Sequence, residues 1–312
     1  MGKVIFGVDL GGTTVKMGLF DPDGNVTEKW EIPTDKSDEG KKILPDIADA
    51  IKKKMAEKNV AKEDVIGVGI GVPGPVDGEG VIFKAPNLGW GTFSIKETLS
   101  GLLDGIKVEA GNDANVAALG EMWKGGGKGY SSLVVVTLGT GVGGGIIVDG
   151  KILTGSTGAG GEIGHIHIVD DEPDTCGCGN NGCLEQYASA TGVVRLAKRR
   201  LAEDKEASTL REGELSAKSV FDAVKAGDKV AIEIAERFGD YLGKGLAAVA
   251  CVVNPEAFVI GGGVSKAGPV LFDYIEKYYK KYVFRGCSDV KFALAELGND
   301  AGIYGAAKLV LG

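Results

Sequence analysis

The sequence predicts an α/β protein of two lobes, each built around the same unit of three strands. Three observations lead to this class. The chain has 312 residues, roughly twice the length of an ordinary domain. A pattern of strand, glycine turn, strand, turn and strand occurs twice, once near residue 10 and once near residue 140. Helical patterns and further strands follow each copy, as in a duplicated α/β domain.

The first copy opens the chain. Apolar residues predict strands over 4–10 and 15–20, and Gly11-Gly12 form the turn between them. The letters DPDG at 21–24 are typical of a type I turn, and a third strand follows directly. These elements together predict an antiparallel meander.

Helices and a buried strand separate the two copies. Ile or Met at every fourth position predicts a helix over 43–55, with lysines on its other face. The apolar run 65–72 is typical of a strand buried on both faces of a sheet. A helix is predicted over 113–123, and the glycines at 125–129 end it.

The second copy repeats the first at a constant offset. Strands are predicted over 134–138 and 144–148, with a turn at 139–141 and a tight hairpin at 149–150. The segments VDLGGTTVKMGLFDPDGNV and VTLGTGVGGGIIVDGKI therefore form the same unit. The remaining pattern predicts helices over 185–201, 219–226, 230–253, 270–279 and 301–309, and a strand over 257–260.

The lobes are assigned from this pattern. We place residues 1–111 and 299–312 in a small lobe, and residues 112–298 in a large lobe. No low-complexity linker separates them, so we expect the lobes to share a tight hinge and to close on their ligands.

Charge and composition exclude several classes of protein. The chain carries 35 Lys and Arg against 43 Asp and Glu, a net charge of −8. This balance repels nucleic acid and anionic lipid, so we expect neither as a partner. The longest apolar run, 246–253, is too short to span a bilayer. Because the sequence shows no secretory signal and has five cysteines, we expect a cytoplasmic protein without disulfides.

The two glycine turns suggest a site for phosphate. No P-loop pattern is present, and the two G-x-G-x-x-G matches are not followed by the helix that a Rossmann site requires. A turn between antiparallel strands can direct backbone N–H groups at a phosphate, because glycine lets the anion approach closely. Asp9 ends the strand before the first turn, where a carboxylate can hold Mg²⁺ through water. The alternative is a pair of ordinary hairpins.

Three cysteines and a histidine lie within nineteen positions and predict a metal site. His165, Cys176, Cys178 and Cys183 supply the four ligands of a tetrahedral zinc ion with no vacant position. The zinc would then be structural, since the loop has too few apolar residues to fold alone. The alternatives are a reduced, metal-free loop or one disulfide. His167 shares a face with His165 in a strand and stays open as a competing ligand.

The segment GNDANVAALGE offers a base for catalysis. It places Asn112 and Asp113 at the end of a strand and at the start of a helix, where backbone N–H groups can hold a carboxylate. From the sequence alone, Asp113 is either a helix cap or a general base.

Several of these segments resemble known families. VDLGGTTVK, LGTGVGGG and VIGGGVS resemble the two phosphate turns and the adenosine turn of the sugar kinase/actin/Hsp70 superfamily. The resemblance implies a duplicated ribonuclease H-like fold of two lobes with ATP in the cleft between them. GGEIGHIHIVDDEPDTCGCGNNGCLEQYAS resembles the signature of the ROK family (repressors, open reading frames, kinases).

The ROK resemblance implies an ATP-dependent kinase that phosphorylates glucose at its C6 hydroxyl, with Asp113 as the general base. It implies that ATP is bound by Asp9, Gly11, Gly12, Thr13, Gly139, Thr140, Gly141, Gly262 and Gly263. It implies that the sugar is bound by Asn87, Asn112, Asp113, Glu162, His165 and Glu185. The histidine would bind structural Zn²⁺ through one ring nitrogen and a sugar hydroxyl through the other.

Other readings stay open beside glucokinase. Fructose, mannose, N-acetylmannosamine or N-acetylglucosamine is the alternative substrate, and a non-catalytic sugar-sensing protein is a remoter alternative. A ROK repressor would carry a basic winged helix, whereas this chain is acidic and begins with the first strand. By the same resemblance we expect ATP and Mg²⁺ as cofactors and a homodimer or homotetramer in solution.

Overall fold

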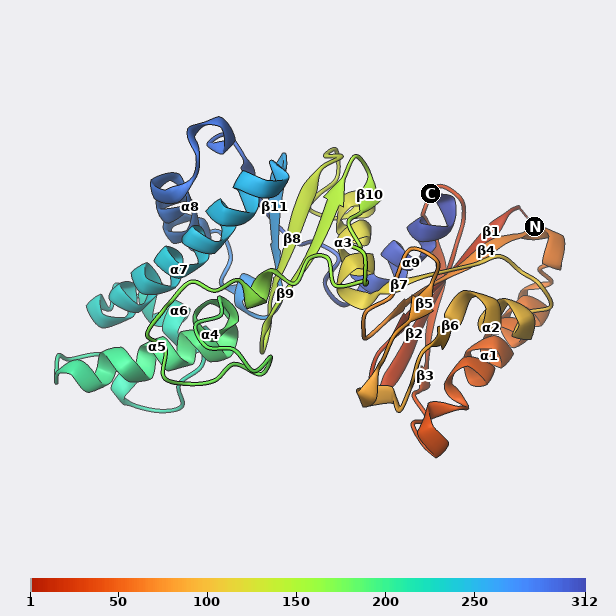
Figure 1. Ribbon diagram of the computed structural model, residues 1–312, viewed down its shortest axis with the longest axis horizontal. Helices are drawn as coiled ribbons and strands as arrows, with labels where there is room; N and C mark the ends of the chain where they lie inside the picture. Colours follow the sequence, from red (N-terminus) through yellow and green to blue (C-terminus); the bar gives the residue numbers. More distant parts are fainter. Residues whose placement is uncertain (1) are drawn as a thin grey trace. The chain divides into compact units, whose positions relative to one another are not determined.

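The computed structural model describes residues 2–312 and contains two five-stranded sheets (Figure 1). The strands of the first sheet are β1 (Val4–Leu10), β2 (Thr14–Phe20), β3 (Val26–Pro33), β4 (Val65–Val72) and β7 (Val108–Asn112). The strands of the second are β8 (Leu133–Leu138), β9 (Val142–Val148), β10 (Lys151–Ile152), β11 (Ala257–Gly261) and β12 (Lys291–Leu294). A small ribbon pairs β5 (Val81–Ile82) with β6 (Phe93–Ser94).

The two sheets have the same strand order. The first runs β3-β2-β1-β4-β7 and the second runs β10-β9-β8-β11-β12. In the first sheet β1, β2 and β3 form antiparallel pairs, and β4 and β7 continue it in parallel. In the second, β10 pairs antiparallel with β9, and β11 pairs in parallel with both β8 and β12. The predicted duplication is therefore confirmed at the level of topology.

Nine helices accompany the sheets in the part of the chain that the structure describes. They are α1 (Ile43–Lys58), α2 (Ile95–Leu102), α3 (Asp113–Lys124), α4 (Glu185–Ala188), α5 (Ala190–Glu203), α6 (Ala217–Lys225), α7 (Lys229–Val253), α8 (Val270–Tyr282) and α9 (Ala301–Leu311). No helix among residues 2–312 is both long and apolar enough to cross a membrane.

The chain divides into two compact units. The first comprises Met1–Ser131, Gly145–Gly161 and Leu297–Gly312, and the second comprises Ser132–Gly144 and Glu162–Glu296. Helix α3 lies in the first unit because it packs along α9, whereas the sequence analysis placed it in the large lobe. The compact units thus do not coincide with the predicted lobes. The division into those lobes stays a prediction.

The first unit has a core on each face of its sheet. Apolar residues of α1 and α2 join the strand residues on one face, and α9 covers the other through Ile303, Ala307 and Val310. Helix α9 lies directly on strand backbone at two glycines. A Cβ on Gly7 would lie 2.1 Å from the carbonyl oxygen of Ile303, and one on Gly69 would lie 1.7 Å from that of Ala306. Only glycine lets this helix approach the sheet so closely.

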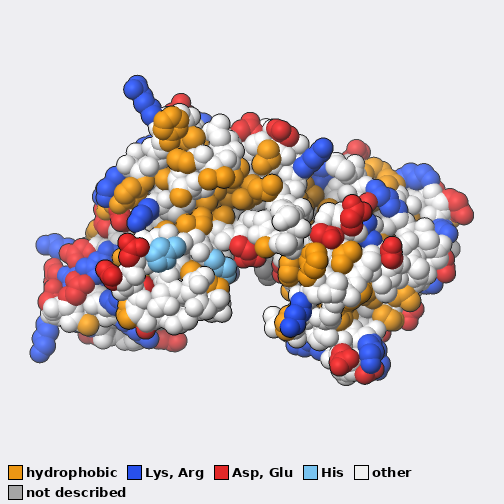
Figure 2. Space-filling model, viewed as in Figure 1, with side chains coloured by type: hydrophobic (Ala, Val, Ile, Leu, Met, Phe, Trp, Pro, Cys, Tyr) orange, Lys and Arg blue, Asp and Glu red, His pale blue; other side chains and the backbone are white. Residues whose placement is uncertain are grey.

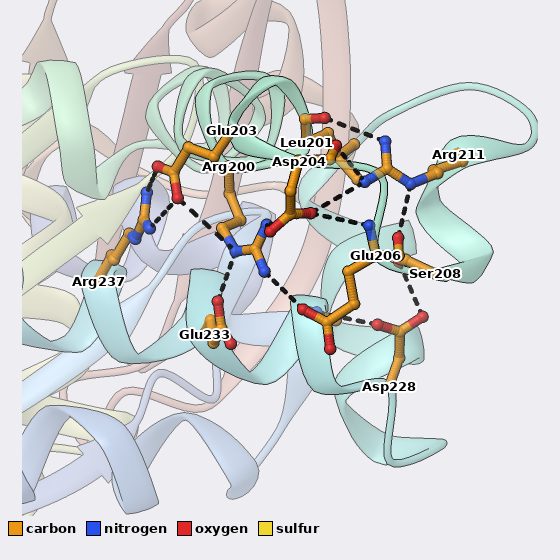
Figure 3. A network of polar contacts seen from close by, with 11 residues as sticks. Arg200, Leu201, Glu203, Asp204, Glu206, Ser208, Arg211, Asp228, Glu233 and Arg237 are labelled. Carbon is orange, nitrogen blue, oxygen red and sulfur yellow. Dashed lines mark hydrogen bonds and ion pairs between the residues drawn. The ribbon is translucent and has the colours of Figure 1, made fainter.

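The second unit is organised around the 25-residue helix α7, whose buried face includes Phe238, Leu242 and Leu246. Helices α4, α5, α6 and α8 all contact it. At the end of α5 the Arg200 guanidinium, 4% exposed, lies among the carboxylates of Asp204, Glu206 and Glu233 (Figure 3). This ion network links the end of α5 and the segment that follows it to Glu233 in α7.

Two predicted helices differ from the observed ones, and two observed elements were not predicted. The predicted helix over 185–201 is interrupted at Ser189, whose extended backbone and side chain cap α5 by accepting a hydrogen bond from the Gly192 amide. The predicted helix over 219–226 starts earlier, because Ser216 and Ser219 form a capping box. Helix α2 and the edge strand β12 were not predicted.

Candidate functional site

The first glycine turn (Gly11, Gly12, Thr13) joins β1 to β2 and is braced by β3. The Thr34 amide donates to the carbonyl of Thr13 at 2.9 Å, and the Thr34 hydroxyl donates to that of Gly11 at 2.8 Å. Gly12 and Thr13 are exposed, and a Cβ placed on Gly12 would meet no atom within 4 Å. The turn is therefore held from behind and has open space in front of Gly12.

Asp9 lies near the end of β1, opposite Lys16 in β2. Burial raises the pKa of the Asp9 carboxyl, the Lys16 ammonium lowers it, and the Asp113 carboxylate raises it again. The two carboxylates are thus close enough to repel one another, and a cation beside them would relieve that repulsion. This is the environment in which a carboxylate binds Mg²⁺.

Asn112 and Asp113 stand where β7 ends and α3 begins. The N-cap is Asn112, whose side-chain oxygen accepts from the amides of Ala114 and Asn115 at 3.0 and 3.2 Å. Its side-chain nitrogen donates to the carbonyl of Gly74 at 3.1 Å. Asp113 is the first helical residue rather than the cap, and its carboxylate accepts from the Ala114 amide at 2.8 Å. Both side chains are therefore held by the first turn of α3.

Asn87 lies in the same unit, on the 3₁₀ turn Pro86–Leu88. Its side chain is exposed while Leu88 beside it is buried. The turn is closed by Trp90, whose amide donates to the carbonyl of Ala85 at 3.1 Å. Asn87 is thus a polar group presented to solvent by a fixed turn.

The second glycine turn (Gly139, Thr140, Gly141) joins β8 to β9 and is braced by the start of α5. The Ala190 amide donates to the carbonyl of Gly139 at 2.8 Å, and the Thr191 hydroxyl donates to that of Thr140 at 2.8 Å. Sequence reasoning missed Thr191, because nothing in its neighbourhood links it to a turn fifty residues earlier. Both glycine turns are therefore supported through their carbonyl groups.

The cysteine cluster is formed as predicted. One ligand atom from each of His165, Cys176, Cys178 and Cys183 lies within 4.8 Å of the other three. The Sγ atoms of Cys178 and Cys183 are 3.6 Å apart, so they are not joined by a disulfide. His167 does not join them, since its ring nitrogens lie at 2.9 Å from the carbonyl of Asn181 and 3.0 Å from the carboxylate of Asp170.

The four ligand atoms fit a zinc ion. Zn–S bonds of about 2.3 Å in a tetrahedron place the sulfurs about 3.7 Å apart, close to the 3.6 Å between Cys178 and Cys183. His165 Nδ1 lies 3.8 Å from Cys176 Sγ. Burial and the neighbouring thiols raise the pKa of Cys183 to about 12, so only a bound cation would keep all three sulfurs as thiolates at neutral pH.

A buried carboxylate anchors the loop that carries these ligands. Glu172 has no exposed side-chain surface and accepts from both terminal nitrogens of Arg199, at 2.8 and 2.7 Å, and from Arg195 at 3.2 Å. The Tyr187 hydroxyl also donates to it. The Arg199 guanidinium holds the pKa of Glu172 down at about 2, well below its usual range. The loop is thus fastened to α4 and α5 by a carboxylate that is negatively charged at neutral pH.

The predicted sugar carboxylates flank the cluster. Glu162 is exposed, with Oε2 4.0 Å from His165 Nε2, the ring nitrogen that faces away from the thiols. Glu185 is half-buried at the start of α4; its Oε2 accepts from the Val142 amide at 3.1 Å, and its Oε1 lies 3.5 Å from Cys176 Sγ. The Glu185 contact with Val142, just after the second glycine turn, was not expected from the sequence.

The third glycine cluster borders a cavity of about 150 Å³. Gly262 adopts a left-handed backbone (φ +83°) against the carbonyl of Leu138, where a side chain would collide. Gly263 has open space around it and lines the cavity. The other lining residues come from α6 and from the turn after Gly263: Ala217, Lys218, Phe221, Asp222, Val264, Lys266 and Ala267. Sequence reasoning missed them, because an amphipathic helix carries no local sign of a ligand.

The structure brings the predicted residues together in two groups. Asp9, the first glycine turn, Asn87, Asn112 and Asp113 belong to the first unit. The second glycine turn, Glu162, His165, the three cysteines, Glu185, Gly262 and Gly263 belong to the second unit. Within each unit, a glycine turn is accompanied by carboxylates on neighbouring elements.

Known proteins resemble this chain over its whole length. The sequence pattern of the ROK family matches residues 5–312. A glucokinase of Halalkalibacterium halodurans is 45% identical, and the match covers 97% of this chain and 94% of that protein. A glucokinase of Thermotoga maritima is 36% identical, with 98% and 96% covered. A ROK family glucokinase from Streptomyces griseus, solved with glucose and AMPPNP, is 37% identical with a TM-score of 0.71 over 98% of both chains.

Proposed function

The chain belongs to the ROK family, and on that premise we propose that it is a glucokinase with Asp113 as its general base. It transfers the γ-phosphoryl group of ATP to the C6 hydroxyl of glucose, giving glucose 6-phosphate and ADP. The full-length similarity to glucokinases from two bacteria supports the reaction. The fixed carboxylate at the start of α3 is the observation that supports the mechanism.

Asp113 has the properties of a base for an alcohol. The alcohol oxygen must lose its proton as its bond to the γ-phosphorus forms and the bond to the β–γ bridging oxygen breaks. The Asp113 carboxylate takes that proton. Its hydrogen bond from the Ala114 amide at the N-terminus of α3 fixes the direction of the carboxylate. Asn112 orients the same turn through Gly74 and the helix amides.

ATP would be held mainly by backbone groups. The first and second glycine turns would offer their amides to the phosphate oxygens, and Asp9 would be the residue that holds Mg²⁺. Gly262 and Gly263 support the adenosine, and the cavity beside Gly263 provides an apolar surface for the base from Ala217, Phe221 and Val264. When bound there, the metal ion would supply positive charge to offset the charge that develops on the transferred group.

Glucose would be bound by paired polar groups. The residues proposed for this role are Asn87, Asn112, Asp113, Glu162, His165 and Glu185. His165 can contribute because Nδ1 faces the thiols, which leaves Nε2 near Glu162 for a sugar hydroxyl. Each such hydrogen bond contributes about 1 kcal/mol, so several together select one hexose.

A zinc ion at His165, Cys176, Cys178 and Cys183 would have a structural role. The four ligands leave no coordination position for substrate. The bound ion would supply folding free energy to the loop and keep the His165 ring in place. Glu172 already anchors the same loop from its other side.

The test is a panel of hexoses against the wild type and Asp113→Asn, with ADP release coupled to NADH oxidation. We expect glucose to give the highest kcat/KM, above fructose, mannose, N-acetylmannosamine and N-acetylglucosamine. Asp113→Asn keeps the shape but not the basicity, so kcat should fall by about 10²–10⁴-fold while glucose still binds. Faster turnover of another hexose would reassign the substrate, and no turnover of any would indicate a non-catalytic sugar sensor.

The oligomeric state is proposed from family membership, and the location from the free cysteines. We expect a homodimer or homotetramer, which light scattering of the purified chain measures directly. We also expect the protein in the cytoplasm, where its reduced thiols would be maintained.

A further inference from the structure

We propose that Glu185 is a positioning residue that links glucose binding to the second glycine turn, so that glucose tightens the binding of ATP. This inference rests on the proposed function, because it assumes that glucose occupies Glu185 and that the turn binds phosphate. Glu185 would then act on the nucleotide site as well as being one of several proposed sugar ligands.

The Glu185 carboxylate is seated against the turn itself. Oε2 accepts from the Val142 amide at 3.1 Å, and a Cβ on Gly141 would lie 2.0 Å from the same oxygen. A side chain at position 141 would displace the carboxylate from the place it occupies beside glycine. An anion thus lies on the backbone of a turn that is proposed to bind the anionic phosphates of ATP.

The same short segment supports the rest of the turn. Ala190 donates to the carbonyl of Gly139 and Thr191 donates to that of Thr140, five and six residues after Glu185. The segment from Glu185 to Thr191 therefore makes hydrogen bonds with Gly139 and Thr140 of the turn and with Val142, the residue that follows it. A shift of Glu185 would be transmitted to the turn by direct hydrogen bonds.

The direction of the effect follows from charge. Without sugar, the Glu185 carboxylate occupies the Val142 amide and repels a phosphate that approaches the turn. A glucose hydroxyl that donates to Glu185 delocalises this charge and competes for the same oxygen. A cavity of about 280 Å³ lined by Thr140, Gly141, Cys176 and Glu185 gives the carboxylate room to turn. The amide then becomes available to phosphate, and by linkage ATP tightens glucose binding by the same factor.

The test measures AMPPNP binding by calorimetry with and without saturating glucose. We expect glucose to lower the Kd of the wild type for AMPPNP at least about fivefold, the lower end of common coupling factors. In Glu185→Gln the charge is absent, so AMPPNP should bind more tightly without glucose and the effect of glucose should fall below twofold. Glu162→Gln is the matched control: Glu162 is the other sugar carboxylate but faces His165, so coupling should persist at saturating glucose.

A second measurement reads the contact directly in the wild type. In the ¹⁵N–¹H spectrum, glucose should shift the Val142 amide, since a carboxylate leaves it or weakens its hydrogen bond. In Glu185→Gln saturated with glucose, that resonance should move much less. This readout does not depend on how well the variant binds nucleotide.

The inference is overturned if Glu185→Gln retains the wild-type coupling, if Glu162→Gln loses it equally, or if glucose binds without moving the Val142 amide. A wild-type chain that binds neither glucose nor AMPPNP would instead contradict the proposed function. The two failures are therefore distinguishable in the same set of titrations.

Discussion

The position of the Asp9 carboxylate depends on Gly302, a residue almost three hundred positions later in the sequence. A Cβ on Gly302, in the first turn of α9, would lie 2.5 Å from Cγ of Asp9 and 2.7 Å from Oδ2. The start of α9 thus bounds the space in which the Asp9 carboxylate can stand. The sequence shows Gly302 only as part of a helix, so this constraint could not be predicted.

Gly302→Ala should displace Asp9 and weaken the use of Mg-ATP. A shift of about 1 Å at a metal-binding group costs up to about 10²-fold, so we expect kcat/KM for Mg-ATP to fall by about 10- to 100-fold. Steady-state kinetics at varied Mg²⁺ measure it. Gly101→Ala is the control: its Cβ meets no atom within 4 Å in helix α2, so it should raise stability by about 0.5–1 kcal/mol. An equal kcat/KM for Mg-ATP in the two variants would show that Gly302 does not control the position of the Asp9 carboxylate.

Glu172 makes stability depend on pH in the acid range. Its pKa is lowered to about 2 in the folded protein, chiefly by Arg199, from the usual value of 4.5. The stabilisation is therefore complete above pH 4.5 and is lost as the pH falls from 4.5 toward 2. It amounts to about 3 kcal/mol, since one pKa unit corresponds to about 1.36 kcal/mol.

Glu172→Gln tests this by urea unfolding at several pH values. The free energy of unfolding of the wild type should exceed that of the variant by about 3 kcal/mol near neutral pH. This difference should narrow as the pH drops below 4.5. Glu79→Gln, at an exposed position, should show a small and constant difference. A pH-independent gap for Glu172→Gln would show that the ion cluster does not govern acid stability.

Sequence reasoning located single residues where a motif fixes them. The spacing of His165, Cys176, Cys178 and Cys183 predicted a cluster that the structure forms. The roles of Glu172 and Thr191 were missed, because each acts on a partner distant in sequence. Nothing in the local sequence distinguishes these two side chains from solvent-exposed ones, because the partners that give them a role are brought close only by the fold.

At the scale of elements, the loop that carries His165, Cys176, Cys178 and Cys183 is the one for which a bound metal ion is proposed as a structural support. Removal of zinc, by a chelator or by Cys178→Ser, should lower kcat/KM for glucose by about 10- to 100-fold, because His165 loses its support. Activity against glucose and metal content by absorption spectrometry are measured together. Cys251→Ser is the control, since Cys251 is an exposed thiol outside the cluster. Full activity in a metal-free protein would refute a structural role for the ion.

Most elements could be predicted because their apolar periods are strong. The strands of both meanders and the long helix α7 match their predicted ranges closely. The break at Ser189 was hidden because apolar residues continue on both sides of it, and only the cap of α5 reveals it. The edge strand β12 has a short, half-buried pattern that does not stand out from a loop.

At the scale of the whole molecule, the net charge of the chain disfavours binding to nucleic acid. Its net charge is −8, and on the face shown in Figure 2 the basic side chains lie singly or beside acidic ones. We expect an apparent Kd for duplex DNA weaker than about 10⁻⁴ M at 0.15 M salt, the weak end of non-specific binding. Fluorescence anisotropy of a labelled duplex measures it, and micromolar binding would contradict the expectation.

The position of helix α9 against the first strands affects the order in which the two units can fold during translation. Helix α9 covers β1 and β4 and packs along α3, so the first unit lacks one layer of its core until α9 has been synthesised and has left the ribosome. The second unit is complete at Glu296. During translation the second unit can therefore fold completely before the first. Strands β1 and β4, although synthesised early, are covered by α9 only afterwards.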